Sequence, residues 1–225
     1  MNIILKTIMI TSFIFFLLIS LFPKKFNDSF EKFTEQDNNF VEKNMIPICC
    51  SWGPELQDRT LTYSIQESGN NDINASESVT KAVDLWNKNL MGMNIVKVNN
   101  TAARSSNEDI KISFIKDGKE VAGKTINSID SNGFIRKSYI ILSKEYFNHP
   151  FNKIQLIQIA KHELGHVLGL NHVKFNGNLM SAQVNKGSTT ISPCLVEAVE
   201  TANSWKLKED SISIHSPIQN YVVCK

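Results

Sequence analysis

The chain has 225 residues, of which 42% are hydrophobic and 20% charged, a composition typical of a globular protein with one domain of ordinary size and some appendages. Its net charge of +2 is too small a bias to indicate binding to nucleic acid or to an acidic partner.

The chain begins with a segment that directs it to a membrane. The run from Ile3 to Phe22 contains a single charge, Lys6, and about 20 apolar residues are enough to span a bilayer. No small-residue cleavage site follows the run, so residues 1–23 are expected to be a membrane anchor in preference to a cleaved signal peptide. Residues 24–49 then form a linker or a short pro-segment.

The cysteines favour export of the folded part. Cys49, Cys50, Cys194 and Cys224 are even in number and show no CxxC spacing, and an exported chain most simply pairs such cysteines as disulfides. Three connectivities are open. Because a bond between the neighbours Cys49 and Cys50 is strained, we expect each of them to pair with a distant cysteine. The expected location is extracellular, either anchored to the membrane or secreted.

The first half of the folded domain alternates strands with one helix. "LTYSI" (61–65) has the period of a strand. A helix follows, with Asn74 and Glu77 as a capping box and Gly92 at its end. "NIVKV" and "IKISF" are then two short strands.

The second half is predicted to add a strand and two helices. "SYIILS" (138–143) is reached through the turn "DSNG", and a helix spans about 152–168. A third helix starts at Ser192, a good N-cap, with Pro193 in its first turn, and continues to about Lys206. This order predicts an α+β domain over 50–206 with a small sheet. Residues 207–225 are expected to be an irregular tail.

The stretch "KHELGHVLGLNH" (161–172) holds three of the five histidines. Residues four apart share a helix face, so His162 and His166 can bind one ion, and neutral imidazole is a favoured zinc ligand. Glu163 lies next to the first ligand, where a carboxylate can accept a proton from zinc-bound water. Gly169 permits a sharp turn that can return His172 as a third ligand. Three protein ligands leave a position open for water, as in catalytic zinc sites.

This stretch resembles the zinc-binding consensus H-E-x-x-H-x-x-G-x-x-H of the metzincin clan of metalloendopeptidases. Met180, eight residues after His172, is similar in spacing to the Met-turn of the matrixins within that clan. The resemblance extends weakly over about 52–206. It implies a zincin-like fold: a small, twisted, mostly parallel sheet with an antiparallel edge strand, an active-site helix and a C-terminal helix.

Several features depart from the matrixin pattern. Val173 replaces the usual serine, and no tyrosine closely follows Met180. Only His149 and His215 lie outside the motif, so structural zinc and calcium loops have no counterpart, and structural calcium is unsupported. The cysteine switch of the pro-segment is absent.

The resemblance implies one catalytic Zn²⁺ and a protein or peptide substrate, with no nucleic acid and a monomeric state. Glu163 would be the general base, and His162, His166 and His172 the ligands. An extended substrate would pair with an edge strand, for which Ile140–Leu142 is the candidate. The wall beyond the scissile bond would come from Ser181–Pro193, whose composition does not indicate a preferred side chain.

Two other functions fit parts of the sequence. "GKEVAGKT" (118–125) matches the phosphate-binding loop of nucleotide hydrolases, but the following residues are poor helix formers, so a chance match in a loop is favoured. A non-catalytic, zinc-containing surface protein is also conceivable, although such a protein has no need of Glu163.

Overall fold

The computed structural model describes residues 44–53, 56, 59–66, 73–98, 108–119, 121–182, 190–204 and 219–224, all within the unit Asn39–Lys225. The expected anchor over 1–23 and most of the expected linker lie outside these residues and stay predictions. Among the described residues, no helix is long and apolar enough to cross a membrane.

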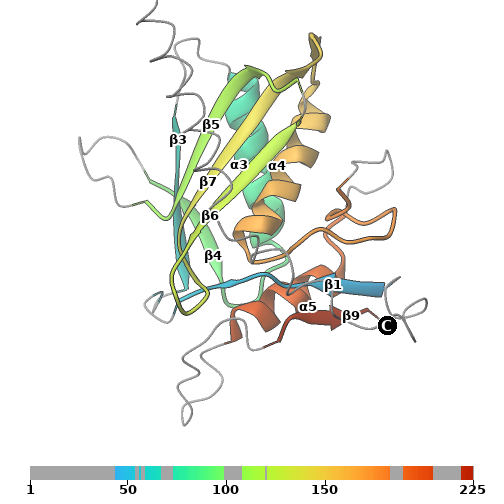
Figure 1. The fold of residues 1–225 in the computed structure, drawn as a ribbon. Helices are drawn as coiled ribbons and strands as arrows, with labels where there is room; N and C mark the ends of the chain where they lie inside the picture. Colours follow the sequence, from blue (N-terminus) through green and yellow to red (C-terminus); the bar gives the residue numbers. More distant parts are fainter. Residues whose placement is uncertain are drawn as a thin grey trace, which may run out of the picture. The chain divides into compact units, whose positions relative to one another are not determined.

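A mostly parallel sheet forms the centre of the fold (Figure 1). Its strands are β2 (Ser51–Trp52), β3 (Thr60–Gln66), β4 (Asn94–Lys97), β5 (Ile110–Asp117), β6 (Gly123–Ile129), β7 (Phe134–Tyr146) and β8 (His149–Pro150). The order is β2-β7-β5-β3-β4 with parallel pairing, while β6 and β8 pair with β7 antiparallel. The predicted α+β class, with a mostly parallel sheet and an antiparallel edge strand, is confirmed.

The longer of the two antiparallel strands is β6, which the sequence analysis did not predict. The segment expected to be a loop, including Lys124 and Thr125, is extended and pairs with β7. A phosphate-binding loop needs a helix that begins at its lysine, and here Lys124 lies inside a strand, so the nucleotide hypothesis loses its structural basis. Strand β7 is internal, with β5 and β6 on its two sides, which makes the predicted edge position of Ile140–Leu142 wrong.

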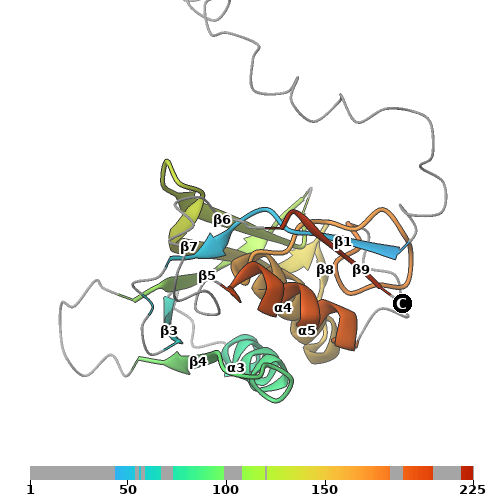
Figure 2. The ribbon, with the colours of Figure 1, turned by 90° about the horizontal axis from the view of Figure 1, so that it is seen from below.

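Helices α3 (Ile73–Asn87) and α4 (Lys153–Val167) lie on the same side of the sheet, as the view from below shows (Figure 2). The predicted start of α4 is confirmed: Asn152 and Gln155 form a reciprocal capping box. The predicted cap at Asn74 is wrong, because Asn74 is already helical and its carbonyl accepts a bond from Ser78.

Helix α5 (Pro193–Ala202) has Ser192 as its N-cap and a proline in its first turn, as predicted. It ends at Ala202, earlier than the expected Lys206. The expected irregular tail contains strand β9 (Tyr221–Val223), which pairs antiparallel with β1 (Met45–Pro47).

The core lies between the sheet and the helices. It includes Leu61, Tyr63, Ile112 and Ile140 from the sheet, all at most 2% exposed. Two tryptophans bond to the backbone in the second half of α4: the Trp86 indole donates to the carbonyl of Lys161, and the Trp52 indole donates to that of Val167, both at 2.9 Å. Helix α4 is therefore anchored through its backbone as well as through packing.

The cysteines pair in two bonds, Cys49 with Cys50 and Cys194 with Cys224. The expectation that Cys49 and Cys50 each pair with a distant cysteine is wrong. The second bond ties the start of α5 to the residue that follows β9.

Candidate metal centre

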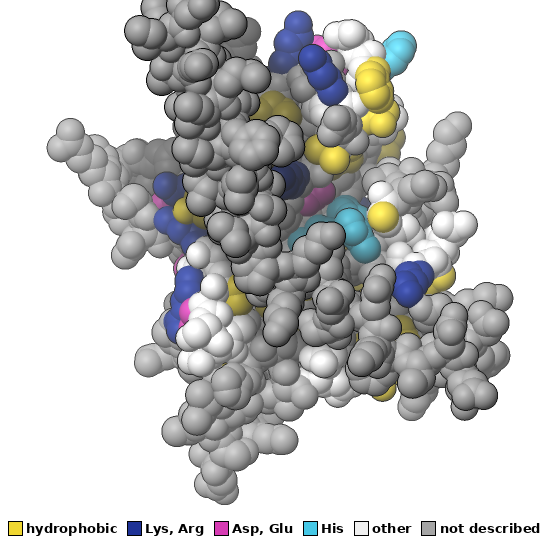
Figure 3. Space-filling view, viewed as in Figure 1, with side chains coloured by type: hydrophobic (Ala, Val, Ile, Leu, Met, Phe, Trp, Pro, Cys, Tyr) yellow, Lys and Arg dark blue, Asp and Glu magenta, His cyan; other side chains and the backbone are white. Residues whose placement is uncertain are grey.

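Helix α4 and the turn after it bring three histidines together. His162 and His166 lie one turn apart on α4, and His172 follows on the returning chain. The Nε2 atoms of the three rings form a triangle whose sides are all 3.2 Å. Histidine side chains are visible beside an acidic side chain on the face shown in Figure 3. Among the described residues, this trio is the one group of three or more metal-binding side chains close enough to hold an ion.

The triangle fits zinc. In a tetrahedral site with Zn–N bonds of about 2.0–2.1 Å, two nitrogen ligands lie about 3.3–3.4 Å apart. The observed 3.2 Å sides are close to this spacing. The three ring nitrogens are therefore placed so that one ion can reach all of them.

Backbone carbonyls fix the protonation of two rings. Nδ1 of His162 lies 2.6 Å from the carbonyl oxygen of Leu179, and Nδ1 of His166 lies 2.8 Å from that of Leu170. Because a carbonyl only accepts, each Nδ1 carries the proton and each Nε2 presents a lone pair to the shared point. These two Nε2 atoms therefore cannot hydrogen-bond to each other, because neither carries a proton. A cation between them can accept both lone pairs.

Burial also keeps the rings neutral. It lowers the pKa of His162 and of His172, and it lowers the pKa of His166 to about 4. Zinc binds neutral imidazole, so the histidines are in the binding form at neutral pH without prior loss of a proton.

The turn that returns His172 depends on Gly169, as predicted. Its φ is +98°, in the left-handed region, and a Cβ there would collide with the carbonyl oxygen of Cys50. The segment around Cys50 braces the turn: the Cys49 amide donates to Gly169 O, and the Asn171 amide donates to Pro47 O, both at 2.9 Å. Residues about 120 positions upstream thus hold the third ligand in place.

Glu163 lies next to the first ligand and is 5% exposed. Burial raises its pKa from 4.5 to about 7, although a hydrogen bond from Thr125 acts in the opposite direction. The Thr125 hydroxyl lies 2.6 Å from Oε2 of Glu163. A carboxyl group whose pKa is near neutrality can both accept and release a proton under physiological conditions.

Strand β6 provides three site residues that the sequence analysis missed. Gly123, Thr125 and Asn127 alternate along the strand and are half-buried, whereas the residues between them are exposed. A Cβ on Gly123 would lie 2.6 Å from Oε1 of Glu163, and Asn127 donates to the carbonyl of His166 at 2.9 Å. The strict alternation of this segment was the available signal, but its inward residues are small or polar.

Met180 lies beneath the helix. It is fully buried, and a Cβ on Gly165 would overlap its sulfur atom. The Val173 amide donates to the carbonyl of Met180 at 2.9 Å, and Val173 itself is buried in the core. The structure therefore places Met180 directly under the turn of α4 that lies between His162 and His166.

Other predicted features lie elsewhere. His149 is exposed on β8 and does not join the cluster, and His215 lies outside the described residues. Most of the predicted wall, residues 183–189, also lies outside them. On α4, the apolar Ile154 is 69% exposed, whereas His162 and Glu163 are buried.

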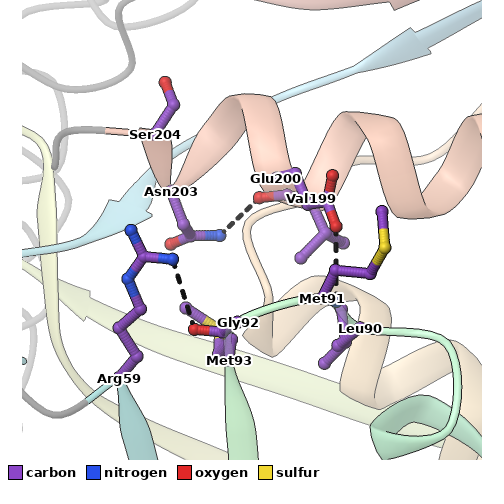
Figure 4. Close-up of a pocket in the computed structure, with 9 residues that line it drawn as sticks. All are labelled: Arg59, Leu90, Met91, Gly92, Met93, Val199, Glu200, Asn203 and Ser204. Atoms are coloured by element: carbon purple, nitrogen blue, oxygen red, sulfur yellow. Dashed lines mark hydrogen bonds between the residues drawn. The ribbon is translucent and has the colours of Figure 1, made fainter. Parts of the chain in front are cut away.

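A separate cavity of about 270 Å³ lies between α5 and the chain that leads from α3 to β4 (Figure 4). Arg59 lines it and donates to the carbonyl of Gly92 at 3.4 Å, while Glu200 accepts from the Met91 amide at 3.3 Å. None of its lining residues belongs to the histidine cluster.

Of the comparisons with known proteins, the family match agrees with this geometry. The family model described as Matrixin, of the M10 peptidases, matches residues 52–194. No curated protein matches. The solved structure described as "GM1 bound form of the ECX AB5 holotoxin" is similar at 18% identity and a TM-score of 0.39, over 66% of this chain and 67% of that chain. A likeness at this level has no bearing on function.

Proposed function

We propose that this chain, which belongs to the matrixin family, is a zinc-dependent endopeptidase whose general base is Glu163. Membership supports a zinc metalloprotease at the level of the family. The observation that carries the finer proposal is the juxtaposition of the 3.2 Å triangle of Nε2 atoms with a buried carboxyl group one residue from the first ligand.

The side chains define a route for the protons. Zinc held by His162, His166 and His172 would lower the pKa of water toward neutrality and polarise the scissile carbonyl. Glu163 accepts one proton from the attacking water as its oxygen bonds to the carbonyl carbon. It then delivers that proton to the departing amine as the carbon–nitrogen bond breaks, so Glu163 ends the cycle ionised again.

We place the substrate backbone along β6 instead of β7. Among the described strands, β6 pairs with β7 alone, and its inward residues contact α4 at Glu163 and His166. An extended peptide can add itself to such an edge through main-chain hydrogen bonds. The peptide would then lie beside the carboxyl group that moves the proton.

We also propose that the domain works outside the cytoplasm, attached to a membrane or secreted. The apolar run near the start of the chain and the two cysteine pairs support this location. Fractionation of cells and protease treatment of intact cells would test it: a domain that stays protected in the cytoplasm would contradict the proposal.

The decisive experiment measures zinc and cleavage together. Purified chain should contain one zinc per molecule and cleave an unfolded protein such as casein. Glu163→Gln should keep the zinc and lose about 10²- to 10⁴-fold in cleavage rate, the usual contribution of general acid–base catalysis. His149→Gln, which removes a histidine outside the cluster, should change neither. A parent that binds zinc without cutting any protein would instead support a non-catalytic zinc protein.

A further inference from the structure

Thr125 lies in the segment that matched a phosphate-binding loop, yet its hydroxyl faces the active-site helix. The hydroxyl oxygen lies 2.6 Å from Oε2 of Glu163 and 3.1 Å from the main-chain carbonyl oxygen of the same residue. Both acceptors are thus within reach of one hydroxyl proton. We infer that Thr125 is a positioning residue that holds the catalytic carboxylate in place. This inference rests on the proposed function.

The shorter contact is the stronger one. Hydrogen bonds from a hydroxyl to a carboxylate are typically about 2.5–2.7 Å long and roughly twice as strong as neutral bonds. A hydroxyl has one proton, so when Glu163 is ionised Thr125 donates to Oε2. The carbonyl of Glu163 offers a second, neutral acceptor when the carboxyl group takes up a proton. The same side chain can therefore support Glu163 before and after proton transfer.

The bond from Thr125 to Oε2 gives the two carboxylate oxygens of Glu163 different roles. With Oε2 bound to Thr125, the incoming proton goes to Oε1. Oε1 faces Gly123, where a Cβ would lie 2.6 Å from it, so the glycine lets the carboxylate lie this close to the strand. Thr125 thus determines which oxygen is held, and Gly123 gives the carboxylate room against β6.

Asn127 also holds the strand, with one bond to helix α4 and one to strand β7. Asn127 donates to the carbonyl of His166 at 2.9 Å, and its own side-chain oxygen accepts from Ser138 at 2.6 Å. Asn127 therefore keeps β6 in register with α4 independently of Thr125. Loss of the Thr125 hydroxyl should free the carboxyl group without detaching the strand.

The test compares Thr125→Val, which keeps the branched shape and removes the hydroxyl, with Thr125→Ser, which keeps the hydroxyl. Thr125→Val should bind zinc as the parent does and should lower kcat about 10- to 100-fold with KM within about twofold. Thr125→Ser should retain at least about half of the parent kcat. Thr80→Val serves as the matched control, because Thr80 donates to Ser76 on the exposed side of α3 and should leave kcat unchanged.

A second readout needs neither zinc nor activity. In the metal-free protein at pH 8, the unfolding equilibrium constant should rise at least about fivefold more on Thr125→Val in the parent than on the same change in a Glu163→Ala background. The main-chain carbonyl at position 163 is present in both backgrounds. The larger effect of Thr125→Val in the parent therefore measures the bond between Thr125 and the Glu163 carboxylate. If Thr125→Val proves too unstable to assay, Thr125→Ala replaces it in both measurements.

The outcomes separate the inference from the proposed function. A zinc-loaded Thr125→Val with parental kcat, or a Thr125→Ser as impaired as Thr125→Val, would overturn the positioning role. Equal effects of Thr125→Val in the two backgrounds would overturn it as well. A parent that binds zinc but cleaves nothing would refute the peptidase proposal, and the coupling measurement would still decide whether Thr125 holds Glu163.

Discussion

Met180 occupies the space that a side chain on Gly165 would fill: a Cβ built on the glycine overlaps the methionine sulfur atom, and the methionine is fully buried. Because Gly165 lies between His162 and His166 on α4, its contact with Met180 fixes the distance of these two ligands from the core.

Gly165→Ala is accordingly expected to destabilise the metal-free protein by up to about 2 kcal/mol. The alanine gains about 1 kcal/mol of helix propensity, but overpacking against Met180 costs about 1–3 kcal/mol. Denaturant unfolding measures the difference. In a Met180→Ala background the added methyl group has room, so the penalty should disappear there; an equal penalty in both backgrounds would show that Met180 is not the obstacle.

Substitution by alanine should be much more damaging at Gly169 than at Gly177, another left-handed glycine. Gly169 and Gly177 both have positive φ, but a Cβ on Gly177 meets no atom within 4 Å, whereas one on Gly169 collides with the Cys50 carbonyl. Gly177→Ala should cost about 1–2 kcal/mol and leave zinc affinity intact. Gly169→Ala should cost more and weaken zinc binding by about tenfold or more, as a competition titration with a chelator would reveal.

Zinc should stabilise the fold through His172. At free zinc 1,000-fold above the dissociation constant, binding adds about 4 kcal/mol to the free energy of unfolding, and a chelator removes this gain. His172→Ala should lose most of the gain because the third ligand is missing, while His149→Ala should keep it. Thermal unfolding with and without zinc distinguishes the two, and a full zinc effect in His172→Ala would exclude this residue as a ligand.

The pH dependence of the free energy of unfolding of the metal-free protein should reflect the raised pKa of Glu163. Burial raises the pKa of this residue from 4.5 to about 7 in the folded state. Between these values the folded chain binds more protons at this site than the unfolded chain, so stability falls as pH rises through that window and levels off above about 7. The whole difference is about 3 kcal/mol.

The comparison with Glu163→Gln isolates this effect. His166, whose pKa burial lowers to about 4, contributes in the opposite sense, since its destabilising effect shrinks as pH rises from about 4 toward 6.5. The histidine is common to both proteins and cancels in the difference. Free energies of unfolding at pH 5, 6, 7 and 8 should show parent and variant diverging up to about pH 7, and a constant difference would refute the raised pKa.

Much of the site could be predicted from local sequence because its geometry is local. Helical spacing puts His162 and His166 on one face, and a glycine at position 169 allows the reversal, which the structure shows as a φ of +98°. The helix starts at Asn152 and Ser192 can likewise be predicted from sequence, since each N-cap bonds to a residue three positions further on.

The remaining parts depend on contacts that the sequence does not display. Strand β6 was missed because its inward positions are a glycine, Gly123, and two polar residues, Thr125 and Asn127, that bond to helix α4. The usual alternation of apolar residues is therefore absent. For a related reason, hydrophobicity alone does not indicate the buried face of α4, because that face includes His162 and Glu163 while Ile154 is 69% exposed.

The pairing of β1 with β9 has a consequence for the time at which the protein becomes active. Of the described elements, β9 leaves the ribosome last, and β1, its partner, leads directly into the residues that brace the turn before His172. A nascent chain therefore contains the complete zinc motif before β1 can pair with β9 and support the turn that precedes His172. We expect the metal centre to mature only after β9 has been synthesised and has paired with β1, so that a nascent chain without β9 does not cut its neighbours. A chain truncated before Tyr221 should accordingly show weakened zinc binding.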